Sequence, residues 1–537
     1  MNHLKHVHAD RLKVGGTAQK PNILEKFVGK SVSFYENDSN RKRLLDSKVM
    51  NMIAVDVQPF SCVEDDGFKE LMKEMDPRYR LPSRSHLRDV VLPSQYESLK
   101  NKLQSVLNDI DFVAITTDLW TSKANEVYIT VTCHFVLNSF TLESAILATR
   151  QLLDTTNHNA INISETLKDV LDDWGVANKV VCVVTDNDAT MLKACELLEY
   201  KHLPCVAHTI NLIVQDVLKL PDFDVILTKC KSVVGFFKRS QIAYSKFKEA
   251  QGDNPRSLLQ EMPTRWNSAY EMIKRILKTN EFITLALVSS RGAPLPFSAA
   301  EVDILNDISE LLSPFEEATL SVSTNTKVSA SIIIPVICEL NHKINNIKVN
   351  TEKGKNISTS IKFSLTKRLT SCETRTIPRI ATILDPRFKK HGFCNPFNAE
   401  EGVKAVQHEL FTQLPANPLH PPTSPTQEPS PFSFLQVKSQ NKVHSSWADG
   451  IILMRQHFEK ENQPEKCDPL VYWQITTDGD AFKTLAKKYF CVPASSCESE
   501  RVFSKTGQLI SERRTRLSST VVDKLLFLNK SKHVNNM

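Results

Sequence analysis

Two aspartates near the ends of apolar runs are the first residues of this sequence with potential for chemistry. The run FVAITTDLW contains Asp118, and the run KVVCVVTDND contains Asp186 and Asp188. An aspartate at a strand end is often a turn former or a helix N-cap, and we assign the N-cap role to Asp188. Asp118 and Asp186 have no such explanation. On the strand pattern alone, a structural role and a metal-binding role both stay open for them.

A third candidate acid lies near the C-terminus, in the segment SSCESERVFS. Ser495 and Glu498 have the spacing of a helix capping box, which accounts for Glu498. Glu500 shares a helix face with the apolar Phe503. An acid on such a face needs a partner, and a metal ion would supply one.

Two further motifs contain residues of metal-binding or nucleic-acid-binding type. Cys205 and His208 have C-x-x-H spacing. This is half of a metal site, and the spacing favours a buried thiol beside a histidine bonded to backbone. Arg265 and Trp266 stand at a predicted helix start, an arrangement suited to stacking on a base. The sequence alone favours a tryptophan that covers the core at this helix start.

The first residues contain only part of a zinc-binding pattern. His3 and His8 have the spacing of the histidine half of a zinc finger, yet no cysteine precedes Cys62. A structural zinc site needs four ligands. We therefore expect a truncated finger and no Zn²⁺ site in this chain.

The elements predicted around Asp118 and Asp186 form an α/β domain. Alternation in YITVTCHFV and the segment SAILATRQLL predict a second and a third strand. A helix, the strand that leads to Asp186 and a further helix follow. This order, with acids on the first and fourth strands, resembles a ribonuclease-H-like fold, in which the two acids meet across neighbouring strands.

The remainder of the chain divides into segments of different pattern. We predict a zinc-finger remnant at 1–9, a basic flexible linker at 10–47, a small helical domain at 48–108, the α/β core at 109–220, an all-α insertion at 221–455 with a Pro-rich disordered loop at 412–435, and a C-terminal region at 456–537 that completes the core.

Composition limits the class of protein. The 537 residues are 41% hydrophobic and 24% charged, and no apolar stretch has membrane-spanning length, so we expect an intracellular protein without a membrane partner. The 12 cysteines never form a C-x-x-C pair, which favours reduced, mostly buried thiols. The net charge of +6 is concentrated at basic ends. Such ends suit contact with phosphate, although a charge run also fits a solvated face.

Four motifs in order resemble those of the hAT family of DNA transposases and the host proteins derived from them. They are TTDLWTS, VTDND followed by CVAHTINL, TRWNS, and SESERVFS ahead of a terminal LLFLN helix. The resemblance covers nearly the whole chain. It implies an α/β, ribonuclease-H-like core interrupted by a large all-α insertion, a hAT C-terminal dimerisation region, and a BED-type finger truncated at the start.

The resemblance also implies roles for individual residues. Asp118, Asp186 and Glu500 match the three catalytic carboxylates, which hold Mg²⁺ or Mn²⁺ for attack on phosphate. Cys205 and His208 match the family's C-x-x-H motif, and Trp266, beside Arg265, matches the tryptophan that steadies the DNA flank. The apolar residues expected to pack against a second copy in the dimerisation region are Trp473, Phe503, Leu525 and Leu526.

Two hypotheses of function follow. In the first, a transposase-derived nuclear protein dimerises and binds DNA or chromatin partners, with a role in transcription and no required catalysis. In the second, an active transposase cleaves and joins DNA with Mg²⁺ or Mn²⁺. The truncated finger favours the first, which we prefer for this chain, and the intact carboxylates favour the second. A third hypothesis, that the chain pairs with full-length relatives, also stays open.

Overall fold

The computed structural model describes residues 33–121, 125–262, 265–413, 446–477, 479–502 and 517–531. The chain divides into two compact units at the boundary between Ser94 and Gln95. Of the predicted features, His3, His8, Phe503 and nearly all of the Pro-rich loop lie outside the described residues.

The first unit is a small helical domain. Its elements are α2 (Asn40–Val55), η3 (Phe60–Glu64), α3 (Asp66–Met75), α4 (Arg84–His86), the π-helical η4 (Leu87–Val91) and the start of α5 (Leu92–Asn108). Helix α2 begins inside the segment that we predicted as a flexible linker, so that prediction is wrong from Asn40 onward. Ser39 caps this helix, and a buried ion pair between Lys42 and Asp46, 3.0 Å apart, stabilises its first turns.

The second unit contains a five-stranded mixed sheet with the order β3-β2-β1-β4-β5. The strands are β1 (Val113–Thr121), β2 (Val127–Val136), β3 (Leu142–Gln151), β4 (Val180–Thr185) and β5 (His202–Pro204). Strands β1, β2 and β3 pair antiparallel, whereas β4 runs parallel to both β1 and β5. The predicted succession of elements along the chain, three strands, a helix, a strand and a helix, is confirmed. Because β1 and β4 are parallel, their carboxyl ends lie at the same edge of the sheet.

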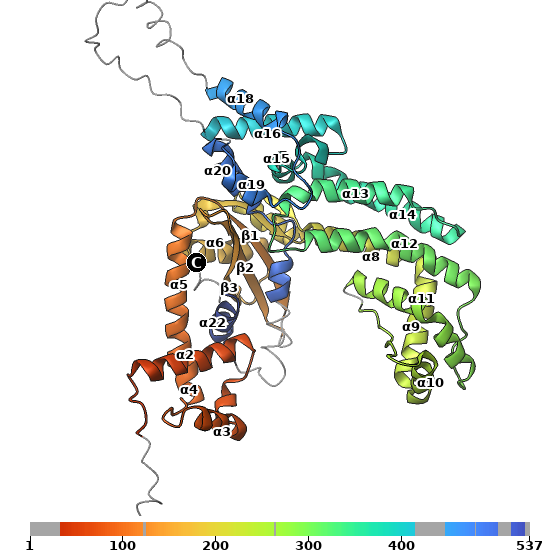
Figure 1. The fold of residues 1–537 in the computed structure, drawn as a ribbon, viewed down its shortest axis with the longest axis horizontal. Coiled ribbons are helices and arrows are strands. Elements are labelled where there is room, and N and C mark those ends of the chain that lie inside the picture. The colour runs from red at the N-terminus through yellow and green to blue at the C-terminus, as the bar shows by residue number, and fades with distance from the viewer. Residues whose placement is uncertain are drawn as a thin grey trace, which may run out of the picture. The chain divides into compact units, whose positions relative to one another are not determined.

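Helices follow the strands as predicted. Helix α6 (Ala160–Asp173) follows β3, α7 (Ala189–Leu197) follows β4, and α8 (Val206–Leu218) follows β5. Asp188 caps α7 by accepting from two backbone N–H groups, as its position predicted. Helix α22 (Ser519–Lys530), from the far end of the sequence, lies beside β3 (Figure 1).

The segment after α8 is all-α, as predicted. Its helices, and those leading to the C-terminal segment, are α9 (Pro221–Arg239), α10 (Gln241–Gln251), α11 (Trp266–Val288), α12 (Ala299–Val322), α13 (Ile333–Asn346), α14 (Glu352–Leu369), α15 (Thr376–Leu384), α16 (Pro396–Gln413), α18 (Ser446–Glu459), α19 (Pro469–Ile475) and α20 (Asp480–Phe490). Their apolar faces join those of β1 and β4 in one continuous core. None of the helices that the structure describes has the length and apolar character of a membrane span.

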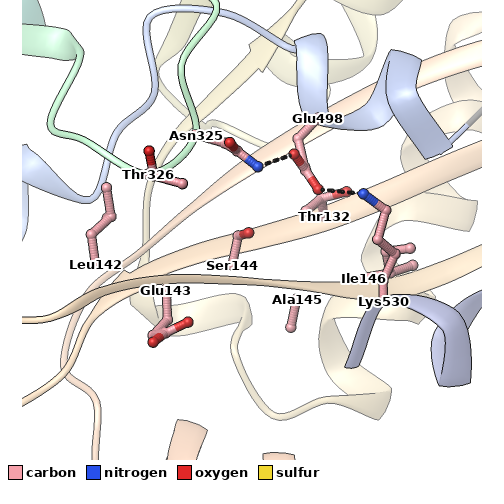
Figure 2. A pocket seen from close by; sticks show the side chains of 10 residues that line it. All are labelled: Thr132, Leu142, Glu143, Ser144, Ala145, Ile146, Asn325, Thr326, Glu498 and Lys530. Atoms are coloured by element: carbon pink, nitrogen blue, oxygen red, sulfur yellow. Dashed lines mark hydrogen bonds and ion pairs between the residues drawn. The ribbon is translucent and has the colours of Figure 1, made fainter. Parts of the chain in front are cut away.

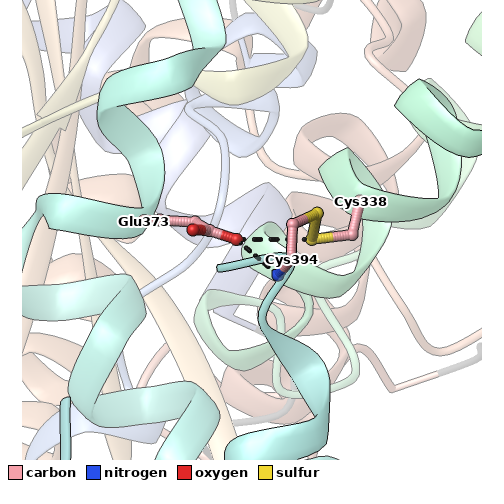
Figure 3. A group of neighbouring side chains, drawn as sticks. All are labelled: Cys338, Glu373 and Cys394. Atoms are coloured by element: carbon pink, nitrogen blue, oxygen red, sulfur yellow. Dashed lines mark hydrogen bonds between the residues drawn. A yellow bond between two sulfur atoms is a disulfide. The ribbon is translucent and has the colours of Figure 1, made fainter. Parts of the chain in front are cut away.

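The cysteines follow our prediction with one exception. Ten are free thiols, eight of them buried. Cys338 and Cys394, separated by 56 residues, form a disulfide that corrects our expectation of reduced thiols throughout. Figure 3 shows Glu373 directed at this bridge, where its carboxylate also accepts from the backbone N–H of Cys394 at 2.6 Å. These two cysteines lie far apart in sequence, and only the helical packing brings them together.

Asp523 on α22 provides a test of how this helix is held. Its carboxylate accepts from the backbone N–H of Thr149 in β3 at 2.6 Å, and burial raises the pKa of Asp523 to about 6. The unfolded chain has a pKa of about 3.9 here, so the stabilisation present below about pH 4 is lost as the pH rises through about 6. Asp523→Asn keeps an acceptor and cannot ionise. We expect it to raise the unfolding free energy at about pH 7.5 by roughly 1–3 kcal/mol.

Urea unfolding at about pH 4 and pH 7.5 measures this difference, which should vanish at the lower pH. Asp172→Asn, at an exposed aspartate on α6, is the matched control and should change little at either pH. Lower stability of Asp523→Asn than of the unmodified chain at pH 7.5 would contradict the linkage.

Candidate active site

The three predicted acids are brought together at the carboxyl edge of the sheet. Asp118 lies near the end of β1, Asp186 follows β4 directly, and Glu500 lies on a helix at 497–502. Burial, and then the charges of Asp186 and Glu500, raise the pKa of Asp118 to about 7. No lysine or arginine in the described part of the chain forms an ion pair with any of the three. Within the described residues, the three acids are therefore not neutralised by ion pairs, and their proximity favours a shared proton or a cation.

The three carboxylates lie close enough to influence one another electrostatically, but in the described structure their oxygens do not form a group of mutually close ligand atoms. Within the described ranges, the one group of ligand atoms that all lie within 4.8 Å of one another is Cys338, Glu373 and Cys394. Asp186 meanwhile accepts from the backbone N–H of Asp188 at 3.1 Å. The charges of Asp186 and Glu500 disfavour ionisation of Asp118, which is the effect expected for carboxyl groups that share a site without a cation. The donor set consists of hard carboxylate oxygens, which fit Mg²⁺ or Mn²⁺ better than zinc.

A buried hydrogen-bond chain that the sequence did not predict holds the helix of Glu500 against β1. The hydroxyls of Ser499 and Thr116 lie 2.9 Å apart, and Thr116 Oγ1 lies 3.1 Å from His134 Nε2 in β2. Burial lowers the pKa of His134 to about 4, so its ring is neutral near pH 7. Thr116 and Asp118 are two residues apart and share a face of β1. The chain thus sets Glu500, the neighbour of Ser499, beside the face that presents Asp118.

Cys205 makes a structural connection of the kind that its spacing favoured. Its sulfur accepts from the backbone N–H of His208 at 3.4 Å, as the N-cap of α8, and from the backbone N–H of Ser496 at 3.3 Å. The backbone N–H of Val206 donates to the carbonyl of Ala494 at 3.0 Å. In the described structure, Cys205 and His208 belong to no group of three metal-ligating atoms. The motif therefore joins the sheet to the segment that carries Glu500.

The predicted capping box of Ser495 and Glu498 is wrong. Ser495 Oγ donates to the carbonyl of Val322, and the Glu498 carboxylate accepts from Asn325 and from Lys530 Nζ, the latter at 3.2 Å. Although burial opposes it, the Lys530 ammonium holds the pKa of Glu498 below its usual range. Figure 2 shows Glu498, Asn325 and Lys530 together at a cavity, whose volume is about 390 Å³. A tertiary ion pair has replaced the local cap and ties α22 to this helix.

Trp266 does not occupy the position that the resemblance implies. Its side chain is 2% exposed, and its ring packs against Tyr270 and Phe315. This is the core position that the sequence pattern alone favours, and it corrects the expectation that the ring stacks on a DNA base. The preceding Arg265 remains exposed.

Three of the four residues predicted to form a dimer contact are buried within the chain, and the fourth, Phe503, lies outside the described residues. Trp473 is fully buried, donates to the carbonyl of Leu384 at 3.0 Å and stacks on Phe482. Leu525 and Leu526 are buried on α22. The apolar pattern identified core positions correctly, but their partners belong to the same chain.

Comparison with known proteins matches three successive segments to family models. Residues 116–208 match the ZBED1 RNase-like domain, residues 203–311 match the ZBED1 RNase-like helical domain, and residues 451–531 match the hAT family C-terminal dimerisation region. The first segment contains Asp118 and Asp186, and the last contains Glu500.

Curated relatives match nearly the whole chain at low identity. Zinc finger BED domain-containing protein 4 of Homo sapiens is 25% identical over 92% of this chain and 44% of its own length. Zinc finger BED domain-containing protein 6 of Homo sapiens is 24% identical over 91% of this chain and 55% of its own length. The putative AC transposase of Zea mays is 22% identical over 98% and 69%. The chain spans about half the length of the two human relatives.

The fold and the matched segments define a protein with an RNase-like α/β core, followed by a helical domain and a hAT-type dimerisation region. More specifically, the chain belongs to the hAT family, as a transposase-derived protein. The fold class predicted from the sequence is confirmed.

Thr116→Val tests the buried hydrogen-bond chain. The substitution preserves shape and leaves Ser499 and His134 without their shared partner, so we expect it to lower the unfolding free energy by about 1–3 kcal/mol. The neighbouring Thr117→Val is a matched control on the same strand. Thr117 is equally buried, and its hydroxyl has no hydrogen-bond partner in the described structure. Urea unfolding should show little loss for the control, and equal losses would refute the positioning role.

Proposed function

We propose that this chain is a nuclear DNA-binding protein, derived from a hAT transposase, that acts as a dimer. The observation that carries the proposal is the meeting of Glu500 with Asp118 and Asp186, which lie in the segment that matches an RNase-like domain. A cluster of carboxylates of this kind would suit a cation-bridged contact with a phosphodiester backbone. The matched dimerisation region supports association of two copies. The similarity to zinc finger BED domain-containing proteins and to a transposase agrees with a DNA partner and a nuclear location.

Metal-dependent cleavage and joining of DNA is a second candidate function, and the unneutralised acids favour it. Asp118, Asp186 and Glu500 would hold Mg²⁺ or Mn²⁺, and such a cation would supply activation of the attacking hydroxyl and stabilisation of the leaving oxygen. The protein's own contribution is to place the acids. Ser499 and Thr116 hold the Glu500 helix on β1, and β4 carries Asp186 to the same edge.

Glu500→Gln separates these two functions. With Mn²⁺ and a labelled DNA hairpin, we expect the variant to cleave at least about a hundredfold more slowly than the unmodified chain, because one ligand for the cation is lost. Its binding to the same DNA should persist, and calorimetry should show weaker Mn²⁺ binding. The control is Asp188→Asn, which changes an acid other than the three predicted metal ligands. Asparagine also caps a helix, so we expect the structure to persist.

Absence of cleavage by the unmodified chain, with DNA still bound, would remove the enzyme candidate and leave the DNA-binding dimer. Cleavage that survives Glu500→Gln would show that the acids act otherwise than we propose.

The dimer contact requires apolar surface that the chain itself does not cover. Val471 and Ile475 lie one turn apart on α19, inside the matched dimerisation region, and are 50% and 74% exposed. We propose that they contact the second copy. Ile475→Asp should weaken the dimer at least about tenfold in analytical ultracentrifugation, because a charge would be buried at the contact.

Ile242→Asp is the matched control. Ile242 lies on α10, outside that region, and is also 74% exposed. A dimer unchanged by Ile475→Asp would place the contact elsewhere on the chain.

A further inference from the structure

A second cavity at the carboxyl edge of the sheet is basic. It has a volume of about 270 Å³ and lies among the end of β5, the start of α8, the end of α14 and the 3₁₀ helix η7 (Thr370–Thr374). Lys367, Arg368 and Arg375 line it, and no carboxylate does. Asn187 also lines it, and Asn187 is the residue that follows Asp186. A cationic cavity therefore adjoins the anionic site.

Two of the three cations form no ion pair with the part of the chain that the structure describes. Arg368 forms an ion pair with Asp216, whose Oδ2 accepts from Nε at 3.0 Å and from Nη2 at 2.8 Å. Lys367 and Arg375 form no ion pair with any residue that the structure describes. Lys367 is exposed, whereas Arg375 is partly buried. A partly buried guanidinium without a partner is costly, so its position is better explained by an external anion.

The nearby His202 does not add charge to the cavity. Burial and, to a smaller extent, the charge of Arg375 lower the pKa of His202 to about 4. The neutral His202 ring lies 2.9 Å from the hydroxyl of Thr185, at the end of β4. The histidine thus adds no charge to the cavity and provides no anion for Arg375.

The size and the donors of the cavity suit a phosphate group. Its volume is below the range of about 300–1,000 Å³ that is usual for drug-sized ligands. Guanidinium groups bind phosphate oxygens through paired N–H donors, and ammonium groups bind them as point charges. The exposed Ser371 stands at the same cavity and offers a hydroxyl donor.

We propose that this cavity binds a backbone phosphate of the DNA strand that enters the carboxylate site. The inference rests on the proposed function, since it assigns a contact for the same DNA. Lys367 and Arg375 hold the phosphate, and Arg368 stays paired with Asp216. Phosphate contacts fix the register of a strand on a protein. A phosphate held beside Asn187 sets which neighbouring phosphodiester lies over Asp118, Asp186 and Glu500.

The test is binding of a labelled DNA duplex of random sequence to the full chain, in EDTA, over a series of salt concentrations. The double variant Lys367→Gln, Arg375→Gln should bind about tenfold more weakly. The slope of log affinity against log salt should fall by about 1, because one phosphate contact is lost. The matched control is Lys355→Gln, Lys362→Gln, which removes the same charge from an exposed part of α14. The control should lose less than about twofold with an unchanged slope.

Ser371→Asp tests the same cavity without removing either cation. It places a negative charge at an exposed position of the lining, so it should weaken binding as much as the double variant, with an unchanged melting temperature. This variant decides the question if the double variant does not fold.

The outcomes separate this inference from the proposed function. Equal weakening by the cavity variants and by the control overturns the phosphate site, whether or not the unmodified chain cleaves DNA. Selective weakening by the cavity variants supports the site even if no cleavage is found. An unmodified chain that binds no DNA overturns both proposals.

Discussion

The buried contact between Ser499 and Thr116 is the interaction on which the arrangement of the site depends, because it joins residues 383 positions apart in sequence. The strands of the sheet lead to only two of the three acids, and the third comes from a segment that follows the whole helical region in the sequence. Two further contacts hold the segment that contains Glu500: Cys205 Sγ accepts from the backbone N–H of Ser496, and Glu498 forms an ion pair with Lys530. The acidic site is therefore a tertiary product of the complete second unit, and its formation reports on the folding of that unit.

The sequence pattern predicted the features that depend on neighbouring residues, namely the strands, the helices and one helix cap. Strand periodicity and the parallel pairing of β1 and β4 placed Asp118 and Asp186 at one edge, and Asp188 caps its helix as its position required. The contacts of His134 could not be predicted, because the alternation of polar residues in a strand does not show which hydroxyl on another strand will bond to the histidine ring. Glu498 had correct cap spacing, yet a lysine from α22 competed for it. Apolar spacing likewise identifies a buried face without saying whether the partner is the same chain or a second copy.

The charges at this edge of the sheet are separated rather than balanced. The three acids lie together without an ion pair to any described lysine or arginine, while Lys367 and Arg375 stand at a cavity whose lining contains no acid. Direct pairing of the two groups would leave neither free for the binding roles proposed above. Keeping them apart leaves the acids to attract cations and the cavity to attract an anion, which is the pattern that a phosphodiester with its counter-ions would match.

The position of α22 has a consequence for the solubility of the chain. Strand β3 is an edge of the sheet, and an uncovered edge offers unpaired N–H and C=O groups to strands of other molecules. Helix α22 covers it, and Asp523 takes up the backbone N–H of Thr149 directly. A product ending before Ser519 would lose this cover together with part of the matched dimerisation region. Such a product would join other copies through strand pairing, and aggregation would replace specific association.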